Sequence, residues 1–512
     1  MKQQHWNKGY ITDIPYIEAF FSYMSPTILN FAAACMGGVG RDLSGDFTYL
    51  ELGCGFGLST TTYAGCFPKG QFYAVDFNPA HIDHAVRQAS RLGIDNVHFL
   101  ERSFEQVLDE PLPDFDYIVL HGIWSWVNAD MRNAICRIIE KKLKPGGLVY
   151  ISYNCLPGWA PEAPLRKWLY EFGTALGSDS LSGIKEGLRT LQQAKTVKDG
   201  YFRNNLDPVL ASFEKKEPRY LAGEYMNEEW HLDYSVDVAD AMASAKLSFV
   251  GSATLAENFQ ELILSKEGMD FVRDLNNTRL RQLAEDFLAM RRFRRDVFVR
   301  GNLPQRHRSL IRNIRDLPVG SFILAKNLPD SVQMPRGTVK LEGPGLDIIR
   351  DALKDGPRPI GDILDFAPQE AKAPDLLRML IILLSGGKLL PFASSYRSPP
   401  IPAEIRKASW PSPINRAIAQ SVLADNRRGA LVSPVIGNGY EIDPSLAALV
   451  GVLDGSENGE GNLAARVKKS LDSHGIIMKT QGAEQEGMAQ VVEQHRTQTL
   501  PSLAQLGLLH VE

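Results

Sequence analysis

Short apolar runs alternate with segments of helical periodicity along the first 155 residues of this 512-residue chain. Most of these runs end at a turn, and an amphipathic stretch such as 131–142 then follows. This order of strand and helix is typical of a parallel sheet that binds its ligand at the carboxyl ends of its strands. The predicted strands are residues 47–52, 71–76, 97–101, 114–120 and 148–153.

A glycine-rich turn follows the first predicted strand. The strand ends near Glu51, and Gly53, Gly55 and Gly57 then occupy alternate positions before a predicted helix. Because glycine has no Cβ, a ligand can lie directly against the backbone of such a turn. The turn lacks the third glycine of the dinucleotide spacing, and a carboxylate at the strand end would repel a pyrophosphate. The pattern instead suits a cationic ligand such as S-adenosylmethionine, which carries an ammonium and a sulfonium group.

A second acidic residue supports this cofactor. Asp76 ends the second predicted strand, about 20 residues downstream, where ribose hydroxyls are bound in such folds, and Phe77 follows it. Ser103 stands where many related enzymes place an aspartate for adenine, so its hydroxyl and the backbone N–H of Phe104 are the predicted adenine contacts. The order of these features favours a ligand site over ordinary turn glycines and an Asp76 that only caps a helix.

The turn Lys-Pro-Gly-Gly at 144–147 is similar to one that marks class I S-adenosylmethionine-dependent methyltransferases. We therefore expect an α/β, Rossmann-like domain over 1–160, with N-terminal helices that either form a lid or cover one face of the sheet. The length predicts about three domains. Periodicity predicts a helical middle domain over 161–300, and an order of three helices and a strand within 301–512 resembles a winged-helix α+β core.

Composition and charge further restrict the class of protein and its possible partners. The formal net charge is −4, so the chain as a whole has no general attraction for nucleic acid. The five cysteines form no Cys-x-x-Cys pair, which indicates neither a zinc site nor a redox dithiol and fits a reducing compartment. No apolar stretch approaches the roughly 18 residues that span a bilayer. We expect a cytoplasmic protein that inserts into no membrane and uses no metal.

The densest positive run is Arg-Arg-Phe-Arg-Arg at 291–295. An aromatic residue among basic ones is compatible with a nucleic-acid surface. However, the chain is acidic and no RNA-binding signature accompanies the run. A solvated or salt-bridged face is therefore favoured, and no nucleic-acid partner is expected.

Six stretches in the first 300 residues match one bacterial family. They are 115–127 (FDYIVLHGIWSWV), 143–147 (LKPGG), 152–159 (SYNCLPGW), 219–227 (RYLAGEYMN), 247–253 (LSFVGSA) and 292–295 (RFRR). The chain resembles bacterial methyltransferases that carry a methyltransferase regulatory domain after the catalytic fold, among them the rickettsial outer-membrane-protein lysine methyltransferases. This resemblance implies the fold, the cofactor S-adenosylmethionine and a lysine acceptor.

The acceptor end of the predicted site follows the fourth and fifth strands. A lysine must lose its proton before it attacks the methyl group, and burial among aromatic side chains lowers its pKa. His121 ends the fourth strand, beside cofactor and acceptor; it either accepts the proton, orients the amine or is a core histidine. Tyr153 and Asn154 are further catalytic candidates, and Asn154 alternatively caps a turn. The predicted acceptor-binding aromatics are Trp124, Trp126 and Trp159.

Trp124 and Trp126 lie two residues apart, so they share a face if the segment is extended. We expect one of the two to pack against the N-terminal helices. Three functions remain open at this point. The favoured one is methylation of protein lysine side chains; the others are a biosynthetic N- or O-methyltransferase for small molecules or peptides, and a cofactor-binding regulator without turnover. So large a non-catalytic portion is also compatible with a homodimer.

Overall fold

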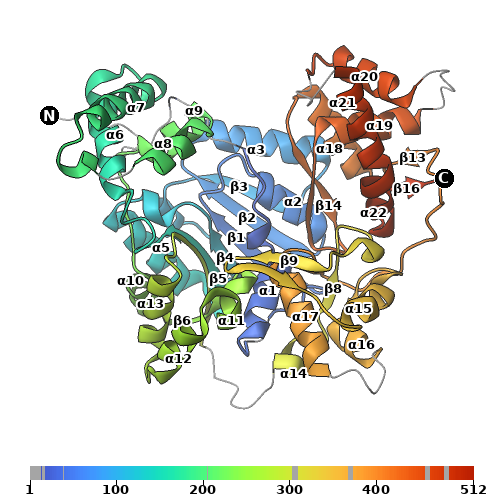
Figure 1. Ribbon diagram of the computed structural model, residues 1–512, viewed down its shortest axis with the longest axis horizontal. Coiled ribbons are helices and arrows are strands. Elements are labelled where there is room, and N and C mark those ends of the chain that lie inside the picture. Colours follow the sequence, from blue (N-terminus) through green and yellow to red (C-terminus); the bar gives the residue numbers. More distant parts are fainter. Residues whose placement is uncertain are drawn as a thin grey trace.

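A seven-stranded sheet forms the centre of the molecule (Figure 1). The structure is a computed structural model that describes residues 13, 18–38, 40–203, 206–301, 310–366, 373–455, 462–477 and 484–512. The strands of the sheet are β1 (Phe47–Leu52), β2 (Gly70–Asp76), β3 (Val97–Glu101), β4 (Phe115–Leu120), β5 (Leu143–Asn154), β6 (Leu247–Ser252) and β7 (Phe293–Arg300). Their order is β3-β2-β1-β4-β5-β7-β6. Strands β1 to β5 run parallel, whereas β7 is antiparallel to both of its neighbours.

The predicted α/β alternation is confirmed in the first 154 residues. All six positions of β4 are buried, which explains its continuous apolar run. Strand β5 begins earlier than predicted, because the Lys-Pro-Gly-Gly segment lies inside it as an irregularity between the pairs Phe115–Leu143 and Tyr117–Leu148. The helices of this part are α1 (Pro26–Cys35), α2 (Leu58–Cys66), α3 (Pro79–Leu92), α4 (Phe104–Val107) and α5 (Ala129–Lys142).

The last two strands of the sheet come from the segment 161–300, for which the sequence predicted a helical domain. The sheet therefore does not end near residue 160: β7 lies between β5 and β6 and pairs with both. Strand β7 carries the buried ion pair of Arg294 with Asp296, 2.9 Å apart. Because these charged residues interrupt the apolar pattern, periodicity does not reveal the strand.

Two arginines of the run 291–295 form buried ion pairs, in agreement with the salt-bridged interpretation. Arg294 contacts Asp286 at 2.5 Å, and Arg291 contacts Glu257 at 2.6 Å. Arg291 and Arg294 are only 7% and 3% exposed. Buried charges persist only when they are paired, so these residues hold β7 against the elements beside it.

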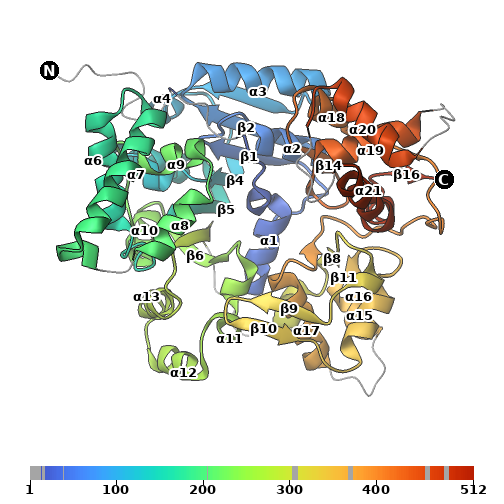
Figure 2. The same ribbon diagram turned by 45° about the horizontal axis from the view of Figure 1, so that its top comes forward.

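The remainder of the segment 161–300 is helical, as predicted. Helices α6 to α9 form a lobe at one side of the sheet (Figure 2), with a small apolar core of its own. The helices of the segment are α6 (Ala163–Leu176), α7 (Ser180–Val197), α8 (Asp207–Glu214), α9 (Pro218–Tyr225), α10 (Ser235–Ser244), α11 (Gln260–Ile263), α12 (Lys266–Asp274) and α13 (Thr278–Leu288).

The chain then forms a group of short strands and helices in which the predicted order of three helices and a strand is present. The helices are α15, α16 and α17 and the strand is β12; their assignment to a winged-helix fold stays a prediction. The elements are α14 (Leu310–Ile314), β8 (Pro318–Gly320), β9 (Ser331–Met334), β10 (Gly337–Lys340), α15 (Gly345–Leu353), β11 (Arg358–Pro359), α16 (Ile360–Asp365), α17 (Ala373–Ser385) and β12 (Leu390–Pro391).

The last hundred residues pack against the first Rossmann half. The hairpin of β14 (Gly429–Ser433) and β15 (Asn438–Ile442) lies beside α2 (Figure 2), and the Cys66 thiol contacts Ser433 N and Asn438 O at 3.3 Å. Among the described helices, none is long and apolar enough to cross a membrane. The other elements are β13 (Ala408–Ser409), α18 (Pro413–Ala424), α19 (Pro444–Asp454), α20 (Leu463–Ser473), α21 (Glu484–Gln494), α22 (Leu500–Gln505) and β16 (His510–Val511).

Candidate functional site

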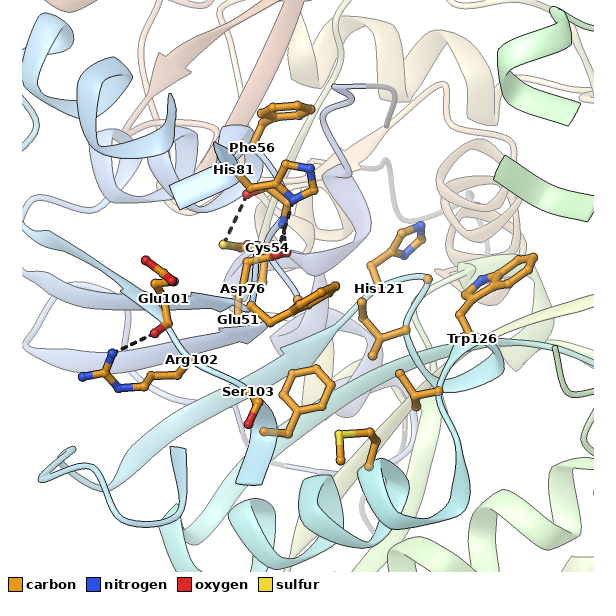
Figure 3. Close-up of a pocket in the computed structure, with 18 of the residues that line it drawn as sticks. Glu51, Cys54, Phe56, Asp76, His81, Glu101, Arg102, Ser103, His121 and Trp126 are labelled. Atoms are coloured by element: carbon orange, nitrogen blue, oxygen red, sulfur yellow. Dashed lines mark hydrogen bonds and ion pairs between the residues drawn. The ribbon is translucent and has the colours of Figure 1, made fainter. Parts of the chain in front are cut away.

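A pocket of about 620 Å³ opens at the carboxyl ends of β1, β2 and β4 (Figure 3). It lies where parallel α/β sheets bind their ligands. Most of the predicted site residues line it. They are Glu51, Gly53, Gly55, Asp76, Phe77, Ser103, Phe104, His121 and Trp126.

The glycine turn forms one wall of this pocket. Gly55 has φ 52°, and a Cβ at this position would meet nothing within 4 Å, so the pocket extends up to its backbone. Its N–H donates to Asp76 Oδ2 at 2.9 Å. Gly53 has φ 78°, and a Cβ there would lie 2.2 Å from the Ile123 side chain. The turn therefore needs glycine for two reasons, a left-handed backbone and close approach.

Gly57 does not line the pocket but packs helix α2 onto its neighbours. It precedes the helix with φ 72°, and a Cβ there would lie 2.6 Å from the Phe99 ring and 2.8 Å from the Ala85 methyl group. Gly57 thus has a packing role, and its predicted cofactor contact stays a prediction. Helix α2 approaches the sheet closely because this position has no side chain.

Glu51 is a buried carboxyl group at the end of β1. It is 4% exposed and accepts a hydrogen bond from Thr60 Oγ1. Burial, with a smaller contribution from the negative charge of Asp76, raises the pKa of Glu51 to about 8. A cation bound beside Glu51 would favour its ionised form. The residue therefore suits the positively charged ligand that its position in the sequence predicts.

Asp76 is held in a fixed orientation by three donors. Besides Gly55 N, the backbone N–H of Asn78 donates to its Oδ1 at 2.9 Å, and His81 Nδ1 lies 3.3 Å from the same atom. The rings of His81 and Phe56 are 4.5 Å apart, and both residues line the pocket (Figure 3). Neither ring was predicted from the sequence, although Phe56 stands within the glycine turn and His81 in the first turn of α3.

Ser103 lines the pocket, but its hydroxyl is already used in a helix cap. It accepts a hydrogen bond from Gln106 N at 3.4 Å and donates to Glu105 Oε2 at 2.9 Å. Ser103 thus begins α4 and places Phe104 in the pocket wall. Glu101 and Arg102, at the end of β3, also line the pocket and were not predicted.

His121 lies at the opposite end of the pocket, beside Trp126 (Figure 3). Its Nδ1 is 2.8 Å from the Tyr150 hydroxyl, and the Phe21 ring packs against its imidazole with centroids 4.1 Å apart. Burial lowers the pKa of His121 to about 3, and the positive charge of Arg295 adds to this effect. The imidazole is therefore neutral at physiological pH. It can donate or accept a hydrogen bond but is a poor acceptor of a full proton.

Tyr153 and Asn154 do not line the pocket. Tyr153 is 1% exposed and its hydroxyl donates to Asp296 Oδ2 at 2.7 Å, which ties β5 to β7. Asn154 is also buried, and its backbone N–H donates to the Ser125 hydroxyl at 2.8 Å. The prediction placed both residues at the edge of the sheet, but the antiparallel strand β7 covers this part of β5.

The three predicted tryptophans lie in different environments. Trp124 is 3% exposed and packs in the core, with the guanidinium of Arg132 over its ring. Trp126 lines the pocket. The two rings do not share a face, because residues 124–126 form a 3₁₀ turn rather than an extended segment. Trp159 does not line the pocket; it packs against Trp230 and the guanidinium of Arg292.

Two segments distant in sequence complete the acceptor end. Glu18, Ala19 and Phe21 line the pocket from the N-terminal side, whereas α1 packs against β6 and β7. The N-terminal segment thus both borders the pocket and covers the sheet, but its pocket-lining part is irregular rather than helical. Residues 14–17, where the helix was also predicted, lie outside the described residues. The other segment contributes Glu229, which no sequence signal identified.

Two family models match the chain. A methyltransferase domain model matches residues 50–149, which hold β1 to β4 and the glycine turn. A model of the predicted methyltransferase regulatory domain matches residues 217–300, which hold α9 to α13, β6 and β7. Within the described residues, no group of three histidine, cysteine or acidic side chains is placed to hold a metal ion.

Relatives extend the match to the whole chain. The uncharacterized protein sll1526 of Synechocystis sp. is 33% identical over 513 residues, which cover 98% of this chain and 99% of the relative. The uncharacterized protein RP028 of Rickettsia prowazekii is 33% identical over 224 residues, 43% of this chain and 89% of the relative. The solved structure of PKMT2 from Rickettsia typhi in complex with AdoHcy has the same fold, with a TM-score of 0.72 at 20% identity over 97% of this chain and 100% of that chain.

The fold, the pocket and the matching models define an enzyme class. The protein is an S-adenosylmethionine-dependent methyltransferase with a Rossmann-like catalytic domain. The chain belongs to the family of methyltransferases that carry a methyltransferase regulatory domain.

Proposed function

We propose that the pocket binds S-adenosylmethionine at its Glu51 and Asp76 end and that the enzyme transfers the methyl group to the amine of a protein lysine. The likeness of fold to PKMT2 along nearly the whole chain is the observation that carries the lysine acceptor. The motifs shared with rickettsial lysine methyltransferases support it. In this proposal the cofactor supplies an activated methyl group on a sulfonium.

The cofactor end fits this ligand in charge and in shape. The carboxyl group of Glu51 faces the ammonium and sulfonium charges, and the open backbone of Gly55 lets the methionyl part lie against the turn. Asp76 accepts hydrogen bonds from the ribose hydroxyls. Phe77 and Phe104 provide apolar surface for the adenine, and the backbone N–H of Phe104 is its polar contact.

The acceptor end positions the nucleophile rather than deprotonating it. His121 is neutral at physiological pH and is oriented by Tyr150, so it directs the lone pair of the amine through a hydrogen bond. Phe21 and Trp126 present aromatic surface to the acceptor, and loss of solvation there lowers the pKa of the incoming lysine. The lysine then releases its proton to solvent before it enters the reaction.

Transfer of radiolabelled methyl groups from S-adenosylmethionine into native lysate tests this function. We expect labelled protein bands with the wild type and none with Asp76→Ala. Asp83→Ala is the matched control, because this carboxylate lies on α3 and is 60% exposed, paired with Arg87 outside the pocket. Label only in small molecules would indicate a biosynthetic enzyme, and cofactor binding without any label would indicate a regulator. Cytoplasmic location and a homodimer stay predictions, which cell fractionation and light scattering address.

A further inference from the structure

The pocket is strongly acidic beyond what the cofactor needs. Of its lining side chains, five are carboxylates and one is a guanidinium, that of Arg102, and none is a lysine. Glu51 and Asp76 belong to the cofactor end, and Glu18 is paired with Arg427. Glu229 differs from these carboxylates because it comes from the regulatory domain, more than a hundred residues after the strand ends that form the pocket.

Hydrogen bonds on both sides fix the position of Glu229. On the side towards the helical lobe, Arg166 donates to Asn227 O, and the Asn227 side chain donates to Gly223 O at 2.6 Å. On the other side, His231 N donates to Ser125 O at 2.8 Å. Because Ser125 immediately precedes Trp126, this last bond places the segment of Glu229 at the acceptor end of the pocket.

A partly buried ion pair continues this attachment. Arg132, on α5, contacts Asp233 at 2.9 Å, and its Nε donates to Trp124 O at 2.9 Å. Asp233 N also donates to Asn154 O at 3.2 Å. The segment is thus joined to the turn after β4 and to the end of β5. Glu229, the charged residue of this segment at the pocket, is therefore held in place by the catalytic domain.

The carboxylate of Glu229 is oriented but not neutralised by a lysine or arginine. His231 Nε2 lies 2.8 Å from Glu229 Oε2. Among the described residues, no donor is bonded to Oε1. A carboxylate with one oxygen held and the other available is a suitable partner for an ammonium group, and charge-assisted hydrogen bonds of this kind are stronger than neutral ones.

We propose that Glu229 is the specificity-determining residue that selects a cationic acceptor chain at the entrance beside Trp126. This inference rests on the proposed function, since it concerns the acceptor of the same site. Glu229 binds the ammonium form on arrival, and Trp126 contacts the aliphatic part of the chain. The regulatory domain thereby contributes directly to acceptor choice.

The experiment compares a cation with a neutral molecule of similar size in the complex with S-adenosylhomocysteine. Binding of n-butylammonium and of 1-butanol is measured by ligand-observed NMR, with the wild type, Glu229→Gln and Glu228→Gln. Glu228 is the matched control because it is the exposed neighbour and does not line the pocket. We expect the wild type and Glu228→Gln to prefer the cation by about tenfold and Glu229→Gln to lose this preference.

Two results would overturn the inference. The first is that the wild type shows no preference for the cation. The second is that the preference persists in Glu229→Gln, which would assign the selection of the cation to another carboxylate such as Glu18. Equal affinity of all three proteins for S-adenosylhomocysteine shows that the variants are folded. The NMR result does not depend on which residue is methylated in lysate, so failure of the lysine assignment and failure of the Glu229 assignment are observed separately.

Discussion

The two ends of the pocket are built in different ways. The cofactor end comes from short segments that follow consecutive strands, around Glu51, Asp76 and Ser103. The acceptor end combines the turn after β4 with the N-terminal segment at Phe21, which packs on His121, and the regulatory domain at Glu229. Cofactor binding therefore requires only the edge of one sheet, whereas the choice of acceptor depends on segments that come from distant parts of the chain.

The C-terminal region takes part in the acceptor end through the N-terminal segment. Ser25 Oγ donates to Gly437 O at 2.5 Å, and the Asn438 side chain donates to Ser22 O at 3.1 Å. Arg427 binds Glu18, which lines the pocket. The hairpin β14–β15 and the turn before it therefore hold the segment that borders the acceptor. No comparable contact reaches Asp76 from this region within the described part of the chain.

The largest expected effect concerns the cofactor end. Asp76→Ala should weaken binding of S-adenosylhomocysteine by about 100-fold or more, because two charge-assisted hydrogen bonds to the ribose are lost, each worth at least roughly 1.5 kcal/mol. Isothermal titration calorimetry measures this, with Asp83→Ala as the control that binds normally. If Asp76→Ala bound S-adenosylhomocysteine as tightly as the wild type, the ribose would not bind at this end of the pocket.

The elevated pKa of Glu51 makes cofactor binding depend on pH. In the free protein the pKa of Glu51 is about 8, above its usual value. The neutral form of Glu51 therefore stabilises the fold at low pH, and this contribution to folding stability is lost as the pH rises through about 8. A cationic ligand favours the ionised form and lowers this pKa. Affinity for S-adenosylmethionine should therefore rise about tenfold from about pH 6.5 to pH 8.5 and then level off. Glu51→Gln should abolish the rise, and a rise that survives this change would assign it to another group.

His121 should act without titrating. His121→Asn removes the imidazole hydrogen bond and should lower kcat about fivefold, as expected for the loss of roughly 1 kcal/mol, with little change in cofactor affinity. Because its pKa is about 3, His121 is neutral throughout the range of about pH 6 to pH 9, and the pH profile of kcat should keep its shape in the variant. If kcat of the wild type instead changed with pH near neutrality, and this change disappeared in His121→Asn, His121 would be a general base.

The smallest effect concerns the contact from the C-terminal region. Arg427→Gln should raise the KM for the acceptor about threefold, since a partly exposed ion pair contributes at most about 1 kcal/mol, and it should leave cofactor affinity unchanged. Arg428→Gln is the control, because this neighbour is exposed and does not line the pocket. A loss of cofactor affinity in Arg427→Gln that the control does not show would contradict the separation of the two ends.

The cofactor end could be predicted from the sequence because its parts follow the chain. A carboxylate, a glycine turn and a second acidic residue lie at the ends of successive parallel strands, and such strand ends necessarily meet at one edge of the sheet. Phe56 and His81 could have been added by the same reasoning. Gly57 does not line the pocket, because a glycine can serve close packing as well as ligand contact.

The acceptor end could not be predicted in this way. Tyr153 and Asn154 follow a parallel strand, but periodicity did not show that β7 would cover them, since Arg294 and Asp296 interrupt its apolar pattern. Local geometry decided between the neighbouring tryptophans, because a 3₁₀ turn directs Trp126 to the pocket and the other ring to the core. Long-range contacts such as that of Glu229 leave no periodic signal in a single sequence.

The central proposal is that one pocket brings S-adenosylmethionine to the amine of a protein lysine. The most direct test is the chemical identity of the methylated group, determined by mass spectrometry of the protein bands labelled by the wild type and absent with Asp76→Ala. We predict that these protein bands contain N-methylated lysine. Methyl groups on oxygen, on another side chain or only on small molecules would contradict it.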